Sequence, residues 1–288
     1  MDTPLGLALG GGAARGIAHI GVLRVLEAEG IRPMLLTGTS SGSLVAAIYA
    51  AGVPLADIER LGRKLRWQQL AEITFSRRGL LEAGRLRALV DRLVGGRTIE
   101  ALRVPLGVVT TDLITGKTYV IRTGKVADAV LASCGVPGVF QPVRRDGRVL
   151  VDGGVTENCP ARAAREMGAD PVIGVELNGW DATVPEPRHM LRVVLRSLDL
   201  MQRAIAERDA MYADVVIRPR LSTISYIDFS KAALLIERGE EAAREALPAI
   251  RAVLAARRGA PAAPAAPGAA TATTAPSEAA AAKGVTTS

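Results

Sequence analysis

Cysteine, aromatic side chains and long apolar runs are all scarce in this chain of 288 residues. Its two cysteines, Cys134 and Cys159, are too few for a disulfide framework and lack metal-ligand spacing, so we expect reduced thiols and no metal. Aromatic residues make up 3% of the chain and no DNA- or RNA-binding motif occurs, which argues against a nucleic-acid partner. The chain contains no run of about 18 apolar residues that could form a transmembrane helix. Residues 1–9 also lack the features of a signal peptide, so we expect a cytoplasmic protein.

Basic charge exceeds acidic charge, with a net charge of +7, and much of the excess lies between Arg60 and Arg97. One interpretation is an electropositive, partly apolar surface that contacts anionic lipid head groups at the inner face of the membrane. The other is a solvated helical face of an arginine-rich protein, which is the more common meaning of a basic run. We take the second as the default and keep peripheral membrane contact as a hypothesis.

Strand and helix signals alternate along the chain up to about Arg257. The predicted strands are Leu5–Leu9, Pro33–Leu36, Val104–Asp112, Lys117–Arg122, Arg148–Val151, Val172–Leu177 and Asp214–Arg218. The predicted helices are Ala14–Glu29, Ser43–Ala51, Val126–Ser133, Ala161–Met167, Met190–Tyr212 and Phe229–Ala256, with an amphipathic stretch over Pro54–Leu70. This alternation predicts an α/β layered domain with a mostly parallel sheet, whose functional groups gather at the carboxyl ends of the strands.

The composition changes abruptly from Gly259 to alanine, proline, threonine and glycine, with no aromatic residue. Such a segment cannot bury enough apolar surface to offset the entropy of ordering it. We therefore expect one folded domain over residues 1–257 and a disordered tail over residues 258–288, to which we assign no function.

The sequence Gly38-Thr39-Ser40-Ser41-Gly42 has the G-x-S-x-G pattern between a predicted strand and a predicted helix. Glycines two residues before and after the serine let the backbone make a strained turn without side-chain clashes. The turn would expose the Ser40 hydroxyl, and the N–H of Ser41 at the helix start would face a developing negative charge. Because the pattern is short, further elements are needed to identify a nucleophile.

A glycine-rich loop, Gly10-Gly11-Gly12-Ala13-Ala14-Arg15-Gly16, follows the first predicted strand. Its backbone N–H groups beside a helix start form a site for anions. The spacing does not match a dinucleotide-binding G-x-G-x-x-G motif, because Arg15 occupies the third glycine position, and no P-loop lysine follows. An oxyanion hole fits better, since the serine turn ends the next strand and consecutive strands tend to be neighbours.

A base for Ser40 is harder to find, because the chain has only two histidines. His19 lies on the helix after the glycine loop and His189 in a proline-rich connection, and neither has the order or setting of an α/β-hydrolase histidine. Asp152 is the better candidate, because a strand carries it into the turn Gly153-Gly154. A carboxylate bonded directly to a serine can accept its proton in a two-residue dyad, provided that the surroundings raise its basicity.

The three motifs Gly10–Gly16, Gly38–Gly42 and Asp152–Gly154, in this order, resemble those of the patatin-like phospholipase family, most closely its bacterial cytoplasmic branch. Residues 132–143 are similar to the segment that precedes the family's aspartate. Residues 152–160, 196–202 and 228–229 are also similar, so the resemblance covers nearly the whole domain.

The resemblance implies a three-layer α/β/α fold and hydrolysis of a lipid acyl ester, without metal or cofactor. It implies Ser40 as nucleophile, Asp152 as base, and an oxyanion hole formed by the backbone of Gly10, Gly11, Gly12 and Ala13. Arg15 occupies a matching arginine position, where it would brace the loop or contact a phosphate, and bracing is the preferred role. Asn158 would stiffen the turn after Asp152.

Three alternatives stay open at this point. The same dyad would serve a thioesterase or a small-ester carboxylesterase, since leaving-group choice depends on the pocket walls. A regulatory protein of this fold could retain the dyad and have little turnover. A nucleotide-binding protein is the third alternative, which the glycine spacing disfavours.

Overall fold

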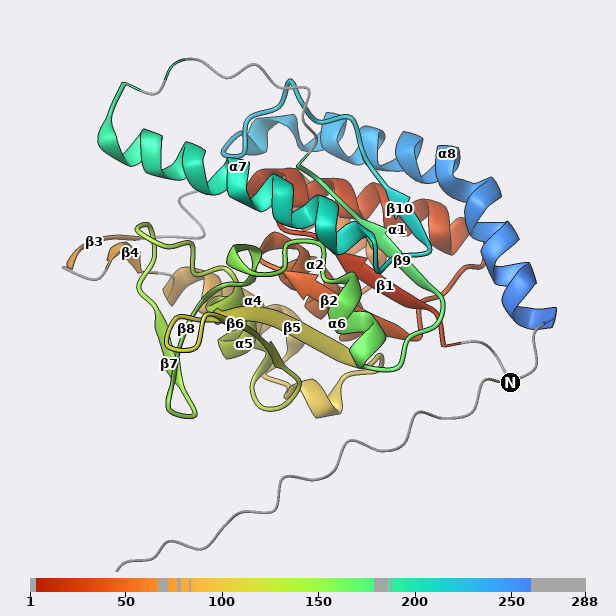
Figure 1. Cartoon of the computed structure of the whole chain (residues 1–288), viewed down its shortest axis with the longest axis horizontal. Coiled ribbons are helices and arrows are strands. Elements are labelled where there is room, and N and C mark those ends of the chain that lie inside the picture. Colours follow the sequence, from red (N-terminus) through yellow and green to blue (C-terminus); the bar gives the residue numbers. More distant parts are fainter. Residues whose placement is uncertain are drawn as a thin grey trace, which may run out of the picture.

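An eight-stranded sheet forms the centre of this computed structural model, which describes residues 4–66, 72–76, 79–82, 84–178, 186 and 188–259 (Figure 1). The strands lie in the order β10, β9, β1, β2, β5, β8 and β7, and β6 also pairs with β5. The bounds are β1 Gly6–Leu9, β2 Leu35–Thr39, β5 Leu106–Asp112, β6 Lys117–Ile121, β7 Val143–Arg145, β8 Arg148–Asp152, β9 Val172–Val175 and β10 Val215–Ile217. The run from β10 to β5 is parallel, while β6, β7 and β8 pair antiparallel. The predicted α/β class with a mostly parallel sheet is confirmed.

Helices cover both faces of the sheet, as the buried residues of β1 require. Leu7 and Leu9 belong to the larger apolar core, whereas Ala8 belongs to a smaller core on the other face, because successive strand residues point to opposite faces. The larger core contains residues of α1 Ala18–Ala28, α2 Ser41–Ala50, α3 Leu55–Lys64, α4 Gly84–Val94, α5 Val126–Ser133 and α8 Ala232–Gly259. The smaller core contains α6 Ala161–Glu166, and α7 Met190–Ala210 packs against α6. The predicted three-layer arrangement is confirmed.

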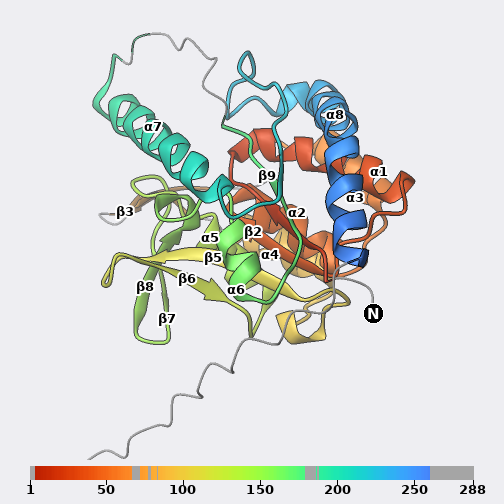
Figure 2. The same ribbon diagram turned by 45° about the vertical axis from the view of Figure 1, so that its right-hand side comes forward.

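The long helix α8 lies alongside α1 with almost no space between the two backbones (Figures 1 and 2). A Cβ atom at Gly21 of α1 would lie 2.0 Å from the carbonyl oxygen of Ile236, and one at Gly239 of α8 would lie 2.0 Å from the carbonyl oxygen of Ala18. Only glycine permits so close an approach. Because α1 follows the glycine loop, this packing fixes the helix on which the loop depends.

Most predicted elements occur with ends shifted by a few residues, and helix 126–133 has the predicted bounds. Two shifts matter for function. The second strand continues to Thr39, next to the serine, and the first predicted helix opens with a 3₁₀ turn over Ala13–Ile17. The prediction did not include α4, β7 or the antiparallel pair β3 Glu72–Ser76 and β4 Gly79–Glu82. From residue 260 onward, the predicted tail lies outside the described residues.

The basic segment between Arg60 and Arg97 includes residues 67–71, 77–78 and 83, which lie outside the described residues. Several of its described arginines have acidic partners close by. Arg60 pairs with Asp57, Arg63 with Glu59 and Arg87 with Asp128. These pairs reduce the local excess of positive charge, and membrane contact through this segment stays a prediction. Among the described residues, no helix has both the length and the apolar character needed to span a membrane.

Candidate active site

The pairing register around β5 places the carboxyl ends of two strands against each other. β2 pairs with residues 106–109 of β5, β8 pairs with residues 110–112, and β6 pairs with residues 108–112. A strand has only two edges for hydrogen bonding. Since β6 occupies one edge over the whole overlap, β2 and β8 must share the other edge, end to end.

This register brings together two residues that are far apart in sequence. Thr39, the last residue of β2, is the partner of Val109, and Asp152, the last residue of β8, is the partner of Thr110. Because β2 is parallel and β8 antiparallel to β5, their carboxyl ends meet. The serine that follows Thr39 therefore lies beside Asp152, as the sequence predicted.

Ser40 occupies a strained turn between β2 and α2. Its φ of 51° lies in the left-handed region that non-glycine residues rarely adopt. Its N–H donates to the Ser133 hydroxyl over 2.8 Å, and that hydroxyl donates to the carbonyl of Val109 over 2.6 Å. The Ser43 hydroxyl donates to the Ser40 carbonyl over 2.7 Å. These bonds tie both backbone polar groups of Ser40 to the surrounding structure, which holds the strained conformation.

Glycine is required on both sides of the serine because the turn passes close to other backbone atoms. A Cβ atom at Gly38 would lie 2.5 Å from the Cα of Ser43. One at Gly42 would lie 2.0 Å from the carbonyl oxygen of Leu9, at the end of β1. The second contact places the serine turn directly against the start of the glycine loop.

The Asp152 carboxyl is almost wholly buried, with an exposed fraction of 1%. Burial raises its pKa to about 6, while hydrogen bonds from the Ser40 hydroxyl and the Gly154 N–H have the opposite effect. The Gly154 bond measures 2.8 Å to Oδ1. A Cβ atom at Gly153 would lie 2.4 Å from the Val109 carbonyl, so this turn also needs glycine. Above a pH of about 6 the buried group is a carboxylate next to a hydroxyl.

Two of the four N–H groups predicted to form the oxyanion hole are already hydrogen-bonded to other parts of the chain. Gly10 N–H donates to the carbonyl of Val175 over 3.0 Å, and Gly11 N–H donates to the carbonyl of Asn158 over 3.1 Å. The N–H groups of Gly12 and Ala13 have no acceptor in the part of the chain that the structure describes. Ala13 also has a positive φ, of 48°. Of the four predicted donors, Gly12 and Ala13 therefore have free N–H groups, and Gly10 and Gly11 do not.

Arg15, within the glycine loop, ties the loop to the segment around residues 224–226. Its Nε donates to the carbonyl of Ile224 over 2.9 Å, and its guanidinium lies 3.8 Å from the centre of the Tyr226 ring. Burial lowers the pKa of the guanidinium. Of the two roles predicted for Arg15, these contacts favour bracing.

Neither histidine takes part in the serine site. His19 is fully buried on α1, and its Nε2–H donates to the carbonyl of Gly10 over 2.8 Å. Burial lowers its pKa to about 4, so the ring is neutral near pH 7. His189 precedes α7. Within the described ranges, no hydrogen bond joins either histidine to Ser40.

Asn158 links the glycine loop to the segment after Asp152. Its carbonyl accepts the Gly11 N–H, and its own N–H donates over 2.7 Å to the buried carboxylate of Asp209. This contact is consistent with the stiffening role predicted for Asn158. The sequence did not point to Asp209 or Ser133, because their partners lie far away along the chain.

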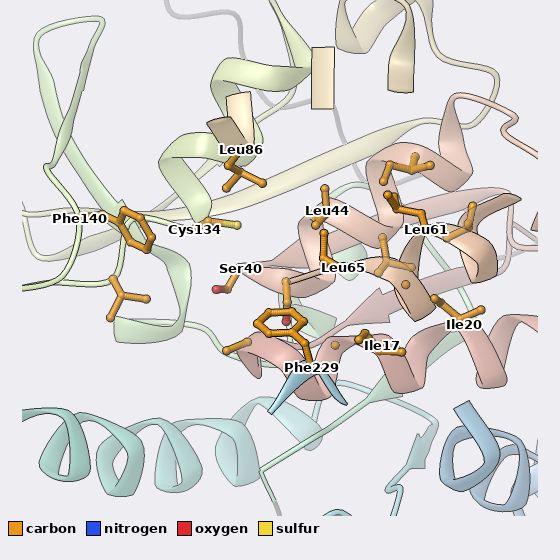
Figure 3. Close-up of a pocket in the computed structure, with 18 residues that line it drawn as sticks. Ile17, Ile20, Ser40, Leu44, Leu61, Leu65, Leu86, Cys134, Phe140 and Phe229 are labelled. Carbon is orange, nitrogen blue, oxygen red and sulfur yellow. The ribbon is translucent and has the colours of Figure 1, made fainter. Parts of the chain in front are cut away.

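Ser40 lies in the wall of an apolar pocket that is open to solvent (Figure 3). The other lining residues come from the glycine loop and the 3₁₀ turn that follows it, α1 to α4, the segment after α5 and the 3₁₀ turn before α8: Ala13, Gly16, Ile17, Ile20, Ser41, Leu44, Val45, Ile48, Ile58, Leu61, Gly62, Leu65, Leu86, Cys134, Val136, Phe140 and Phe229. Burial and the neighbouring Asp152 raise the pKa of the Cys134 thiol, which keeps it neutral. Among the described residues, no group of histidine, cysteine and carboxylate side chains could hold a metal ion.

A family model described as patatin-like phospholipase matches residues 7–165. An uncharacterized NTE family protein of Mycobacterium tuberculosis, Rv2565, is 31% identical over 271 residues, which cover 85% of this chain and 46% of the relative. Patatin-like phospholipase domain-containing protein 6 of Mus musculus is 33% identical over 189 residues, covering 62% of this chain and 14% of the relative. The chain thus spans less than half the length of these relatives.

A solved structure, VipD from Legionella pneumophila, is similar to this chain with a TM-score of 0.62 and 16% identity. The similarity covers 86% of this chain and 67% of VipD. At this level of identity it shows a shared fold.

The buried Asp152 carboxyl predicts an unusual pH dependence of stability. Its pKa of about 6 lies above the ordinary value of 3.8, so the folded state holds the proton more tightly than the unfolded state. Its contribution to the free energy of unfolding is therefore most favourable below about pH 4 and is lost as the pH rises through 6. We expect Asp152→Asn to remove this loss, so that the variant gains on the order of 3 kcal/mol relative to wild type between pH 4 and pH 8.

Urea denaturation of both proteins across this pH range measures the difference. Asp228→Asn is the control, because Ser230 lowers the pKa of the Asp228 carboxyl from its ordinary value of 3.8, so this group titrates below the range and its difference from wild type should stay nearly constant. A difference between Asp152→Asn and wild type that stays constant with pH would contradict the raised pKa.

Proposed function

Because the chain belongs to the patatin-like phospholipase family, we propose that it hydrolyses lipid acyl esters, as a phospholipase A or lysophospholipase-like esterase. Ser40 is the nucleophile and Asp152 the general base. The observation that carries this proposal is a hydroxyl in the wall of an apolar pocket, bonded to a buried carboxylate. Nucleophile, base and a pocket poor in water are the parts that acyl transfer requires.

In the first step, the Ser40 oxygen attacks the ester carbonyl while its proton moves to Asp152. The raised pKa makes the carboxylate a stronger base than an exposed aspartate, yet leaves it deprotonated at neutral pH. The tetrahedral intermediate then collapses, Asp152 returns the proton to the leaving alcohol oxygen, and an ester between Ser40 and the acyl group remains.

The negative charge of the tetrahedral intermediate needs nearby N–H donors. We assign this role to Gly12 and Ala13, whose N–H groups lack acceptors in the described structure, and to Ser41, whose N–H opens α2. One such donor contributes on the order of 3 kcal/mol to transition-state stabilisation. Gly10 and Gly11, which the sequence included among the donors, instead hold the loop in place through Val175 and Asn158.

Hydrolysis of the acyl-enzyme reverses the first step with water in place of the alcohol. Asp152 takes a proton from water, the water oxygen attacks the acyl carbon, and the proton returns to Ser40 as the carboxylic acid leaves. The sequence of steps needs no metal ion or cofactor.

The pocket favours a lipid over a small ester, because its lining is almost entirely aliphatic and aromatic beyond Ser40. Ile17, just before α1, and Ile20 of α1 face Leu61 of α3 and Leu65, just after α3, across the space beyond the serine (Figure 3). Such a lining stabilises an acyl chain by removing it from water, about 0.8 kcal/mol for each buried CH₂ group. Thioesters of the same acyl chains would fit equally well, and a substrate panel separates the two leaving groups.

The cytoplasmic location and the Arg60–Arg97 membrane contact belong to this proposal as well.

Removing either member of the dyad should abolish turnover while the fold persists. We expect Ser40→Ala and Asp152→Asn each to lower kcat on a p-nitrophenyl ester by a factor on the order of 10³ or more. A fluorophosphonate that reacts with activated serines should label wild type and the matched variant Ser230→Ala, but not Ser40→Ala. Circular dichroism confirms folding. Full esterase activity in Ser40→Ala contradicts the assignment, and a wild type that fails to react with the probe indicates a regulatory protein instead.

A side chain at position 62 of α3, where the protein has glycine, should shorten the acyl chain that the pocket accepts. A Cβ atom there would already lie 2.8 Å from Cδ1 of Ile20, so any side chain narrows the space between α1 and α3. We expect Gly62→Val to lower kcat/KM for a long-chain ester on the order of tenfold, with little effect on a butyrate ester. Gly84→Val is the control, because no atom lies within 4 Å of a Cβ at Gly84. Equal losses for both chain lengths would show that the acyl chain lies elsewhere.

A further inference from the structure

The outer face of α7 carries a row of exposed apolar side chains, which we call the α7 stripe: Met190, Val193, Val194, Leu200 and Met201. Met190 is 84% exposed and Met201 57% exposed. Residues at these spacings lie on one side of an α-helix. The opposite side carries the buried residues Arg203 and Ala206.

This arrangement is unusual for the surface of a folded domain, where a helix normally turns its polar side outward. The stripe extends from Met190 to Met201, about 17 Å along the helix axis. Figures 1 and 2 show α7 at the periphery of the molecule, on the side away from α8. Its outer face is therefore available to a partner.

Polar contacts fix α7 to the active site from its inner side. Asp199 accepts a hydrogen bond of 2.5 Å from the Tyr226 hydroxyl and pairs with Arg203 over 3.1 Å. The Tyr226 ring stacks on Arg15, which braces the glycine loop. One residue beyond Tyr226, Ile227 is 71% exposed. The stripe thus lies on a helix that is tied to the site.

The apolar segment is also basic. Residues 188–201, which carry the stripe, contain three arginines and one acidic residue, Asp199. Arg188 is exposed, whereas the side chain of Arg196 is 25% exposed and pairs with Asp199. Apolar side chains flanked by arginines are the combination that binds an anionic lipid surface, since the chains enter the head-group region while the arginines meet lipid phosphates.

We propose that the α7 stripe docks the protein on anionic bilayers. The choice of a bilayer rests in part on the proposed function, because a lipid hydrolase meets its substrate there. Exposed apolar side chains, and not charge, distinguish α7 from the Arg60–Arg97 segment, because Arg196 pairs with Asp199 just as Arg60, Arg63 and Arg87 pair with acidic partners. Docking through α7 would bring the membrane surface to the helix that is tied to the glycine loop.

The test uses the full chain with Ser40→Ala and vesicles of non-hydrolysable diether phosphatidylglycerol or diether phosphatidylcholine, so that binding is independent of turnover. Co-sedimentation should show binding to the anionic vesicles that weakens as salt increases. In the same background, the combined change Val193→Gln, Val194→Gln and Met201→Gln should lower the partition coefficient at least tenfold. Met34→Gln should not, because Met34 precedes β2 at the opposite end of the sheet and is 47% exposed, as Val193 is.

Folding of the triple variant is checked with Ser40 intact, where hydrolysis of a soluble butyrate ester should be unchanged. Undiminished vesicle binding by the triple variant, or no binding by the parent, would overturn the proposal and leave the hydrolase assignment untouched. A third result would also overturn the proposal. If the parent binds no vesicles and is a dimer in analytical ultracentrifugation, while the triple variant is a monomer, the stripe contacts a second copy of the chain. Conversely, vesicle binding through the stripe by a protein that hydrolyses no ester would separate docking from the proposed function.

Discussion

β2 and β8 share one edge of β5. β2 pairs with it in parallel and β8 antiparallel, and the two strands end opposite adjacent β5 residues, Val109 and Thr110. This arrangement puts a hydroxyl and a carboxylate side by side without a loop having to position either of them. Ser133 extends the same constraint, because its hydroxyl bridges the Val109 carbonyl and the Ser40 N–H. The positions of the two residues of the proposed dyad are therefore set by backbone hydrogen bonds, which tolerate little displacement.

The site also concentrates unfavourable features that the rest of the fold must offset. Ser40 and Ala13 have positive φ values, and the only other non-glycine residue of this kind in the described chain is Asp146 in the β7–β8 turn. Each such conformation costs roughly 1–3 kcal/mol. Burial of Asp152 destabilises the folded protein at neutral pH, and the pKa that it raises would make the carboxylate a stronger base in the proposed mechanism. The close packing of α1 on α8 through Gly21 and Gly239 supplies rigidity near the glycine loop.

The chemistry of the site could be predicted from sequence further than its surroundings. Motifs of local origin predicted Ser40, Asp152 and the glycine turns, because strand–turn–helix context and glycine requirements are written in neighbouring residues. Which N–H groups of the loop are free depends on Val175 and Asn158, which are distant in sequence, so the sequence could not show that the N–H groups of Gly10 and Gly11 are already bonded. The apolar face of α7 was not predicted either, since a periodic row of valine and methionine is equally typical of a buried helix face.

The pH dependence of kcat/KM for a soluble ester tests most directly whether Asp152 is the base. Because the carboxylate must be deprotonated, activity should rise with pH, reach half its maximum near pH 6 and level off above pH 7. His19, with a pKa of about 4, cannot produce this rise, and the profile should be the same in His189→Gln. A profile that is flat between pH 5 and 8, or a rise that disappears in His189→Gln, would contradict a dyad that works without histidine.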